Sequence, residues 1–244
     1  MKFTYTQYER MVDLLRQKQF EFVKYSNYSK NSRCVILRHD IDYSLKKAVE
    51  FAEFEKELGI SSTYMVLLSS DFYNVFSKEG TECVQKIIEF GHSIGLHFDE
   101  KKYENNDRGI EENIKEEIII MNYLVGEKKI DSISMHRPSK TFLDMDLNLN
   151  EYGIKNSYNQ EFFKEFKYVS DSRMEWREPI MDYIQSDRYE KYQILTHPFW
   201  YRDNEQDIET IIFDFIRSAK RERIDKFSLN FRDLENIVGK RREK

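Results

Sequence analysis

The sequence is poor in residues that break or cross-link a chain. Of its 244 residues, only 3 are proline, 8 are glycine and 2 are cysteine. No stretch rich in proline, glycine or serine marks a linker, so a single domain over residues 1–244 is expected. The cysteines, Cys34 and Cys83, lack the spacing of a disulfide or metal motif. We expect both to be buried apolar residues and not nucleophiles.

The sequence also lacks a long apolar segment and an excess of positive charge. Glu9 and Arg10 come before any long apolar run, so neither a secretory signal nor an anchor is expected, and the protein is predicted to be cytoplasmic. The formal net charge is −5, and the main basic cluster is the tail 240–242, to which we assign no function. Phosphate neutralisation needs a concentrated basic face, so nucleic acid is not an expected partner.

Apolar runs of strand length alternate with segments of helical periodicity. Thr6 and Glu9 have the form of a capping box, and Ser44 is expected to begin a second helix that ends near Gly59. Helices are expected over about 6–19, 44–59, 77–90, 109–125 and 203–223, and strands at 33–39, 62–68, 92–97, 130–136, 153–157, 167–172, 192–197 and 226–231. This alternation predicts an α/β fold with mainly parallel strands. Since no glycine-rich phosphate loop follows the first strand of the alternation, nucleotide binding of the usual kinds is not expected.

Polar side chains stand where several apolar runs end. They are Asp40, Asp42, His97, His136, Arg137, Asp171 and His197. Barrels place functional groups on many strand ends, whereas open sheets concentrate theirs at a switch point, so this distribution favours a barrel with one shared site. These residue types bind divalent metals and move protons.

Asp40 and Asp42 are two residues apart in a run that is expected to be extended, so both carboxylates should point to one side. Two carboxylates so close are costly to ionise without a cation beside them, which predicts a metal. The alternative to a metal site is a purely structural role, in which one aspartate caps the next helix and the other lies in the turn before it. By the same alternation His39 should face the other way, and His92 starts its run at the opposite sheet edge, so we expect both to be structural.

Five short motifs, RHDID, GHSIGLH, HRPS, YVSDS and LTHP, follow one another in this order over about residues 33–200. This order resembles the polysaccharide deacetylases, the family 4 carbohydrate esterases, and specifically their divergent branch with an HDxD first motif. The resemblance implies a distorted (β/α) barrel that holds one divalent metal, usually zinc. It also implies hydrolysis of an N- or O-acetyl group on a sugar.

The resemblance also implies roles for individual residues. Asp40 matches the general base, Asp42 or Asp40 the metal-binding aspartate, and His97 the first metal-binding histidine. Arg137 matches the arginine that orients the base, Asp171 the fourth-motif aspartate, and His197 the general acid. The second metal-binding histidine would fall at Lys101, which cannot bind metal while charged. A replacement ligand is therefore needed, and His136, Asp42 together with Asp40, or Asp99 are the candidates.

The leading hypothesis is a metal-dependent carbohydrate deacetylase that acts on a sugar or glycan precursor, as in surface polysaccharide synthesis. A different class of function is a non-catalytic protein that binds a glycan or a glycan-synthesis partner on the same barrel. The loss of the second metal-binding histidine, at Lys101, supports this alternative. A barrel hydrolase of non-sugar amides would use the same metal chemistry. Aromatic residues on loops predicted above the site are candidates for stacking on sugar rings: Phe142, Phe199, Trp200 and Tyr201.

Overall fold

The computed structural model describes residues 1–29, 32–104, 109–144, 147 and 149–234. The chain divides into two compact units, residues 1–203 and 204–244. The motif core at about 33–200 lies within the first unit, and the expectation of a single domain over the whole chain stays a prediction. The basic tail at 240–242 lies outside the described residues.

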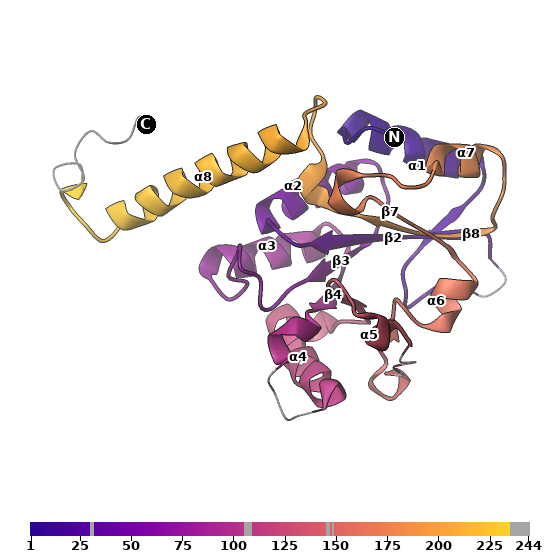
Figure 1. The fold of residues 1–244 in the computed structure, drawn as a ribbon, viewed down its shortest axis with the longest axis horizontal. Coiled ribbons are helices and arrows are strands. Elements are labelled where there is room, and N and C mark those ends of the chain that lie inside the picture. The colour runs from indigo at the N-terminus through magenta and orange to yellow at the C-terminus, as the bar shows by residue number, and fades with distance from the viewer. Residues whose placement is uncertain (30–31, 105–108, 145–146, 148, 235–244) are drawn as a thin grey trace. The chain divides into compact units, whose positions relative to one another are not determined.

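The first unit is built around one sheet, in which all the described strand pairings are parallel (Figure 1). Its strands are β1 (Glu21–Val23), β2 (Cys34–Ile41), β3 (Thr63–Val66), β4 (Ser93–Phe98), β5 (Ser132–Met135), β6 (Lys155–Asn156), β7 (Lys167–Ser170) and β8 (Lys191–Thr196). They are ordered β6-β5-β4-β3-β2-β8-β7, and β1 pairs with the first residues of β2. All eight residues of β2 are buried, as expected for a central parallel strand covered on both faces.

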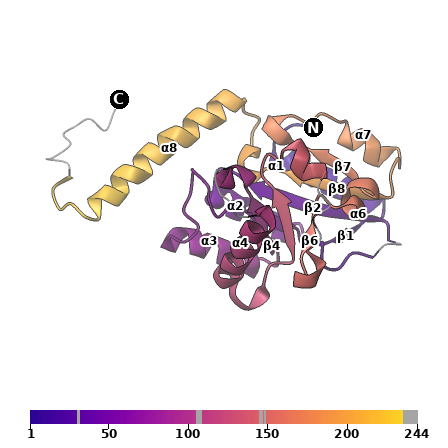
Figure 2. The same cartoon turned by 60° about the horizontal axis from the view of Figure 1, so that its bottom comes forward.

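α-Helices precede, connect and follow these strands. They are α1 (Tyr5–Gln17), α2 (Leu45–Glu57), α3 (Lys78–Glu89), α4 (Ile110–Val125), α5 (Lys140–Asp144), α6 (Gln160–Lys164), α7 (Ile180–Gln185) and, in the second unit, α8 (Ile208–Ser228). The hydroxyls of Ser44 and Ser77 cap α2 and α3 by accepting backbone N–H groups of their first turns. Figures 1 and 2 show α2, α3 and α4 following one another along one side of the sheet.

The sheet curls so that its β6 end approaches β2 and β8. Arg38 on β2 donates to the Ser157 hydroxyl just after β6, at 3.1 Å, although three strands separate β6 from β2. The Gln193 side chain on β8 donates to the Ser157 carbonyl at 3.3 Å. No backbone pairing joins β6 to β7 in the described part of the chain, so main-chain hydrogen bonds do not close the sheet. The expected barrel of mainly parallel strands is confirmed, and its distortion is this incomplete closure.

A fully buried polar network joins α2 to the sheet. The Glu55 carboxylate accepts hydrogen bonds from the hydroxyls of Tyr8, Ser62 and Tyr64, and it lies 2.9 Å from His39 Nε2. His92 Nε2 lies 2.9 Å from the Ala52 carbonyl, and its Nδ1 lies 3.0 Å from the Ser62 hydroxyl. His39 and His92 are therefore structural groups, as their positions in the sequence predicted.

Two expectations about chain ends are wrong. The cap of α1 is Thr4, whose hydroxyl accepts from the Gln7 backbone N–H at 3.3 Å, so the helix starts before the predicted capping box at Thr6. Residues 226–231 were expected to form a strand, but α8 continues to Ser228 and a turn follows. Alternating apolar residues in this stretch fit a strand, but no neighbouring strand pairs with it in the described residues.

Among the residues that the structure covers, no helix is long and apolar enough to cross a bilayer.

Candidate metal centre and hydrolytic site

Three side chains converge at the carboxyl ends of β2, β4 and β5. Asp42 follows β2, His97 is the penultimate residue of β4, and His136 follows β5. His97 Nε2 and His136 Nδ1 each lie 3.3 Å from Asp42 Oδ1, and they lie 3.2 Å from each other. Each residue thus offers one ligand atom to a common point, and these atoms all lie within 4.8 Å of one another.

These distances fit a divalent metal. Tetrahedral zinc with bonds of about 2.0–2.1 Å separates its ligand atoms by roughly 3.3 Å, close to the edges of this triangle. Asp42 Oδ1 is buried, and it accepts no hydrogen bond from the described residues, so it lacks the partner that a buried oxygen requires. Two imidazoles and one carboxylate are also the donor set of catalytic metal sites that keep a position open.

Neighbouring groups orient the ligands. His97 Nδ1 lies 2.7 Å from the hydroxyl of Ser134, its register partner on β5, which leaves Nε2 to face Asp42. Burial raises the pKa of Asp42, but the imidazoles of His136, His97 and His197 outweigh it and hold the pKa well below its usual range. The carboxylate is therefore ionised, as a metal ligand must be.

Asp40 lies beside this triangle and pairs with an arginine of its own strand. Arg38 Nε donates to Asp40 Oδ1 at 2.8 Å, and one terminal nitrogen donates to Oδ2 at 2.7 Å. Asp40 Oδ2 lies 3.5 Å from His97 Nε2. Burial raises the pKa of Asp40. The positive charge of Arg38 and the His97 imidazole lower this pKa by more than burial raises it, so the net shift is downward. Asp40 is thus held ionised next to the candidate metal position.

The arginine that hydrogen-bonds to Asp40 is therefore Arg38, whereas the sequence motifs assigned the orientation of this carboxylate to Arg137. Arg137 is 62% exposed and donates to Asp99 at 3.4 Å, and its φ of 49° turns the chain away after β5. Arg38, Asp40 and Asp42 alternate along β2, and the period of two places them on one face. That spacing was visible in the sequence and pointed to Arg38.

Asp99, which the sequence also offered as a replacement ligand, lies outside the triangle. Its carboxylate accepts from the Lys101 backbone N–H at 3.1 Å and from Arg137 at 3.4 Å. Lys101 is exposed. Among the replacement ligands suggested for Lys101, His136 is the one that lies beside His97, with its Nδ1 3.2 Å from His97 Nε2.

His197 and Asp171 complete the site from β8 and β7. His197 Nδ1 lies 2.6 Å from Asp171 Oδ1, and the His197 backbone N–H donates to the other carboxylate oxygen at 3.0 Å. His197 Nε2 faces Asp42 Oδ2 at 3.7 Å. Burial lowers the pKa of His197, but Asp171, Asp42 and Asp40 raise it, to about 9 overall. At neutral pH the ring is therefore protonated, with Nε2–H directed into the site.

The aromatic residues expected to stack on sugars belong to the core. Phe142, Phe199, Trp200 and Tyr201 are all buried. Tyr201, for example, packs edge-on against Tyr8 with ring centroids 5.7 Å apart. Since at most 5% of each residue is exposed, they offer no face to a ligand.

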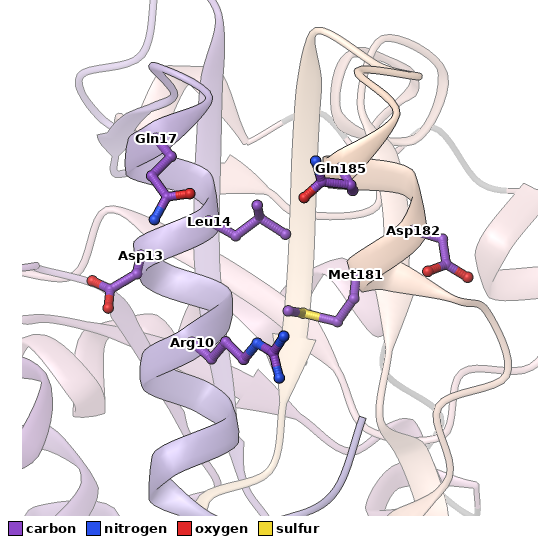
Figure 3. Close-up of a pocket in the computed structure, with 7 residues that line it drawn as sticks. All are labelled: Arg10, Asp13, Leu14, Gln17, Met181, Asp182 and Gln185. Atoms are coloured by element: carbon purple, nitrogen blue, oxygen red, sulfur yellow. The ribbon is translucent and has the colours of Figure 1, made fainter.

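Figure 3 shows a surface hollow elsewhere, between α1 and α7, into which Leu14 and Met181 point. Its other lining residues are Arg10, Asp13, Gln17, Asp182 and Gln185. None of them belongs to the site described above.

Neither a protein-family model nor a curated protein matches the sequence. Solved structures do. The chain is similar to family 4 carbohydrate esterases. One, from Bacillus anthracis, is 16% identical with a TM-score of 0.46, and the match covers 85% of this chain and 86% of that one.

Two further structures show the range of these similar proteins. A pseudoenzyme of the same family from Bacillus anthracis is 12% identical with a TM-score of 0.45, over 78% of this chain and 63% of its own. The chitin deacetylase of the fungal pathogen Colletotrichum lindemuthianum is 11% identical with a TM-score of 0.40, over 77% and 82% of the two chains.

Proposed function

We propose that this protein is a metal-dependent hydrolase that removes an N- or O-acetyl group from a sugar or glycan precursor. The observation that carries the proposal is that three metal-type ligand atoms lie together with the Asp40 carboxylate and the His197 imidazole beside them. The acetylated sugar as substrate follows from the order of the sequence motifs. Zinc is the metal that the two imidazoles and the carboxylate favour.

Asp42, His97 and His136 would hold the ion. A bound divalent ion there supplies polarisation of the acetyl carbonyl and lowers the pKa of a water molecule towards neutrality. Hydrolysis needs in addition a base for the water proton and an acid for the leaving group, and the two remaining polar pairs of the site provide them.

Asp40 acts as the base. It is ionised and almost fully buried, and its two hydrogen bonds from Arg38 fix its orientation toward the ligand triangle. A carboxylate paired with a guanidinium is a weak base, so it suits a water molecule that is already acidified.

His197 acts as the acid. Its Nδ1 is held by Asp171, so the proton on Nε2 is the one available to the leaving nitrogen or oxygen of the sugar. Because Nε2 lies 3.7 Å from Asp42, the acid and the base both border the ligand triangle.

The test begins with metal content, measured by mass spectrometry after reloading with several divalent ions. Wild type is expected to bind one ion per chain, and His97→Ala, His136→Ala and Asp42→Ala are expected to lose it. Asp99→Ala serves as the control, since its carboxylate pairs with Arg137 outside the triangle. Failure of wild type to bind a stoichiometric ion would instead support the non-catalytic glycan-binding function.

Activity is tested next, by assay of acetate released from acetylated sugars by the loaded protein. Asp40→Asn is expected to reduce the turnover number by roughly 10²–10⁴-fold, the usual contribution of a positioned base. Bound metal should stay at the wild-type level in this variant. Wild-type turnover in Asp40→Asn would contradict the role of Asp40.

A further inference from the structure

Two aromatic rings lie close to the backbone of Asp42, outside the residues assigned a role above. Tyr43 directly follows the ligand Asp42, and Phe72 lies in the loop between β3 and α3. Their ring centroids are 5.1 Å apart and the rings meet edge to face at 69°. On its other side Tyr43 packs on the buried rings of Phe199 and Trp200, at 4.8 and 5.5 Å. The pair of Tyr43 and Phe72, here called the rim pair, thus rests on the core.

The loop that carries Phe72 is attached to the strand that carries Asp42. The Tyr73 hydroxyl donates to the Ile41 carbonyl at 2.7 Å, and the Ser70 hydroxyl donates to the Asp42 carbonyl at 3.3 Å. The same Ser70 oxygen accepts the Phe72 backbone N–H at 3.1 Å. Phe72 is therefore positioned relative to Asp42 by direct hydrogen bonds, although 50% of its surface is exposed.

A half-exposed phenylalanine in a loop that is hydrogen-bonded to the Asp42 backbone suits a ligand with an apolar face. Exposed apolar rings gain free energy when they are covered, and the negative face of an aromatic ring attracts C–H groups that carry partial positive charge. Small-molecule sites combine such aromatic walls with a few oriented polar groups, as here with Asp40, His197 and the ligand triangle.

Sugar rings present both features, a face of C–H groups and a polar edge. We propose that the rim pair is a sugar-stacking subsite, in which Phe72, supported by Tyr43, binds the face of the pyranose ring that carries the acetyl group or of its neighbour. This inference rests on the proposed function, because that function brings a sugar to the site.

The loop contains its own control residue. Phe76 is 49% exposed, nearly the same as Phe72, but within the described residues it stacks on no aromatic ring. Replacing either phenylalanine removes similar exposed apolar surface, and only Phe72 belongs to the rim pair.

The experiment compares metal-loaded, full-length wild type with Phe72→Ala, Phe72→Trp and Phe76→Ala by the acetate that they release. The substrates are N-acetylglucosamine oligomers, O-acetylated xylose oligomers and an aliphatic acetate ester that has no ring. Phe72→Ala is expected to raise KM for the better sugar about tenfold, with kcat nearly unchanged, because one ring contact is lost. Its kinetics on the aliphatic ester should match wild type. Phe72→Trp should restore KM, and Phe76→Ala should behave as wild type.

The inference is overturned if Phe72→Ala leaves the sugar KM unchanged or raises KM equally for the aliphatic ester. It is also overturned if wild type hydrolyses the ester but none of the sugars, in which case a metal-dependent hydrolase remains. Absence of acetate release from every substrate by loaded wild type marks failure of the proposed function itself, and the stacking subsite falls with it.

Discussion

At the scale of single residues, the side chains of β2 determine most of the proposed chemistry. Arg38 and Asp40 are both buried and share two hydrogen bonds, and Asp42 lies on the same face two residues later. Their neighbour His39 faces the other side and joins Glu55. In the proposed mechanism, β2 and the residue that follows it thus contribute a metal ligand, a base and the cation that keeps the base ionised.

The two arginines give a direct test of this assignment. Arg38→Lys keeps the charge but cannot make both hydrogen bonds to Asp40, so the turnover number should fall on the order of 10²-fold through misplacement of the base. Arg137→Lys, on the exposed partner of Asp99, should stay close to wild type. Acetate release with metal content measured in parallel decides between them, and the reverse ranking would restore Arg137 as the orienting arginine.

His197 predicts a stability change at alkaline pH. Its pKa is about 9 in the folded protein against an ordinary value of 6.5, so its pairing with Asp171 stabilises the fold fully below about pH 6.5. That stabilisation, about 3 kcal/mol, should disappear as the pH rises from about 6.5 to about 9. Denaturant unfolding of metal-free protein across this range measures it. Asp171→Asn should show a much flatter dependence, and an equal slope in both proteins would exclude the pair as the cause.

At the scale of elements, α2 is fixed to the sheet by the carboxylate of Glu55. Burial raises the pKa of Glu55, but His39, His92 and the Ser62 hydroxyl lower it to about 2 overall. Since this is below the ordinary 4.5, the ionised carboxylate stabilises the fold above about pH 4.5, and that stabilisation is lost as the pH falls to about 2.

Glu55→Gln should therefore lower the free energy of unfolding by about 3 kcal/mol at neutral pH, because it leaves buried donors without their charged acceptor. The difference from wild type should shrink between about pH 4.5 and 2. Glu57→Gln, on the exposed side of the same helix, should change stability by less than about 0.5 kcal/mol. Chemical denaturation at several pH values gives the comparison, and a pH-independent deficit in Glu55→Gln would point to packing instead.

Elements with strong local signals were predictable from the sequence, and those fixed by distant contacts were not. The buried run of β2 and the serine caps of α2 and α3 follow from neighbouring residues alone. By contrast β1, of three residues, depends on pairing with β2, and α6 has too few residues to show a period.

The same division applies within the site. Strand-end positions indicated Asp40, Asp42, His97, Asp171 and His197 as neighbours, because parallel strands bring their carboxyl ends to one edge. The sequence did not choose among the replacement ligands for Lys101, since the approach of His136 to within 3.2 Å of His97 depends on how β5 pairs with β4.

At the scale of the whole molecule, the candidate site lies entirely in the unit of residues 1–203. A protein that ends at Asp203 is expected to fold and to bind one metal ion with wild-type affinity. Calorimetry of metal binding, together with thermal unfolding of the shortened and full chains, checks this. Loss of metal binding in the shortened chain would show that residues 204–244 are needed to form the site.

Asp42, His97 and His136 are far apart in the chain and meet only when β2, β4 and β5 stand in register. An unfolded chain therefore cannot offer the three ligands together, and an ion that binds them binds the native state alone. The concentration of the ion then shifts the folding equilibrium. A free ion at a hundred times its dissociation constant adds about 2.7 kcal/mol to the free energy of unfolding. If the ion binds as proposed, its supply in the cell would raise the fraction of this protein that is folded and that escapes quality control.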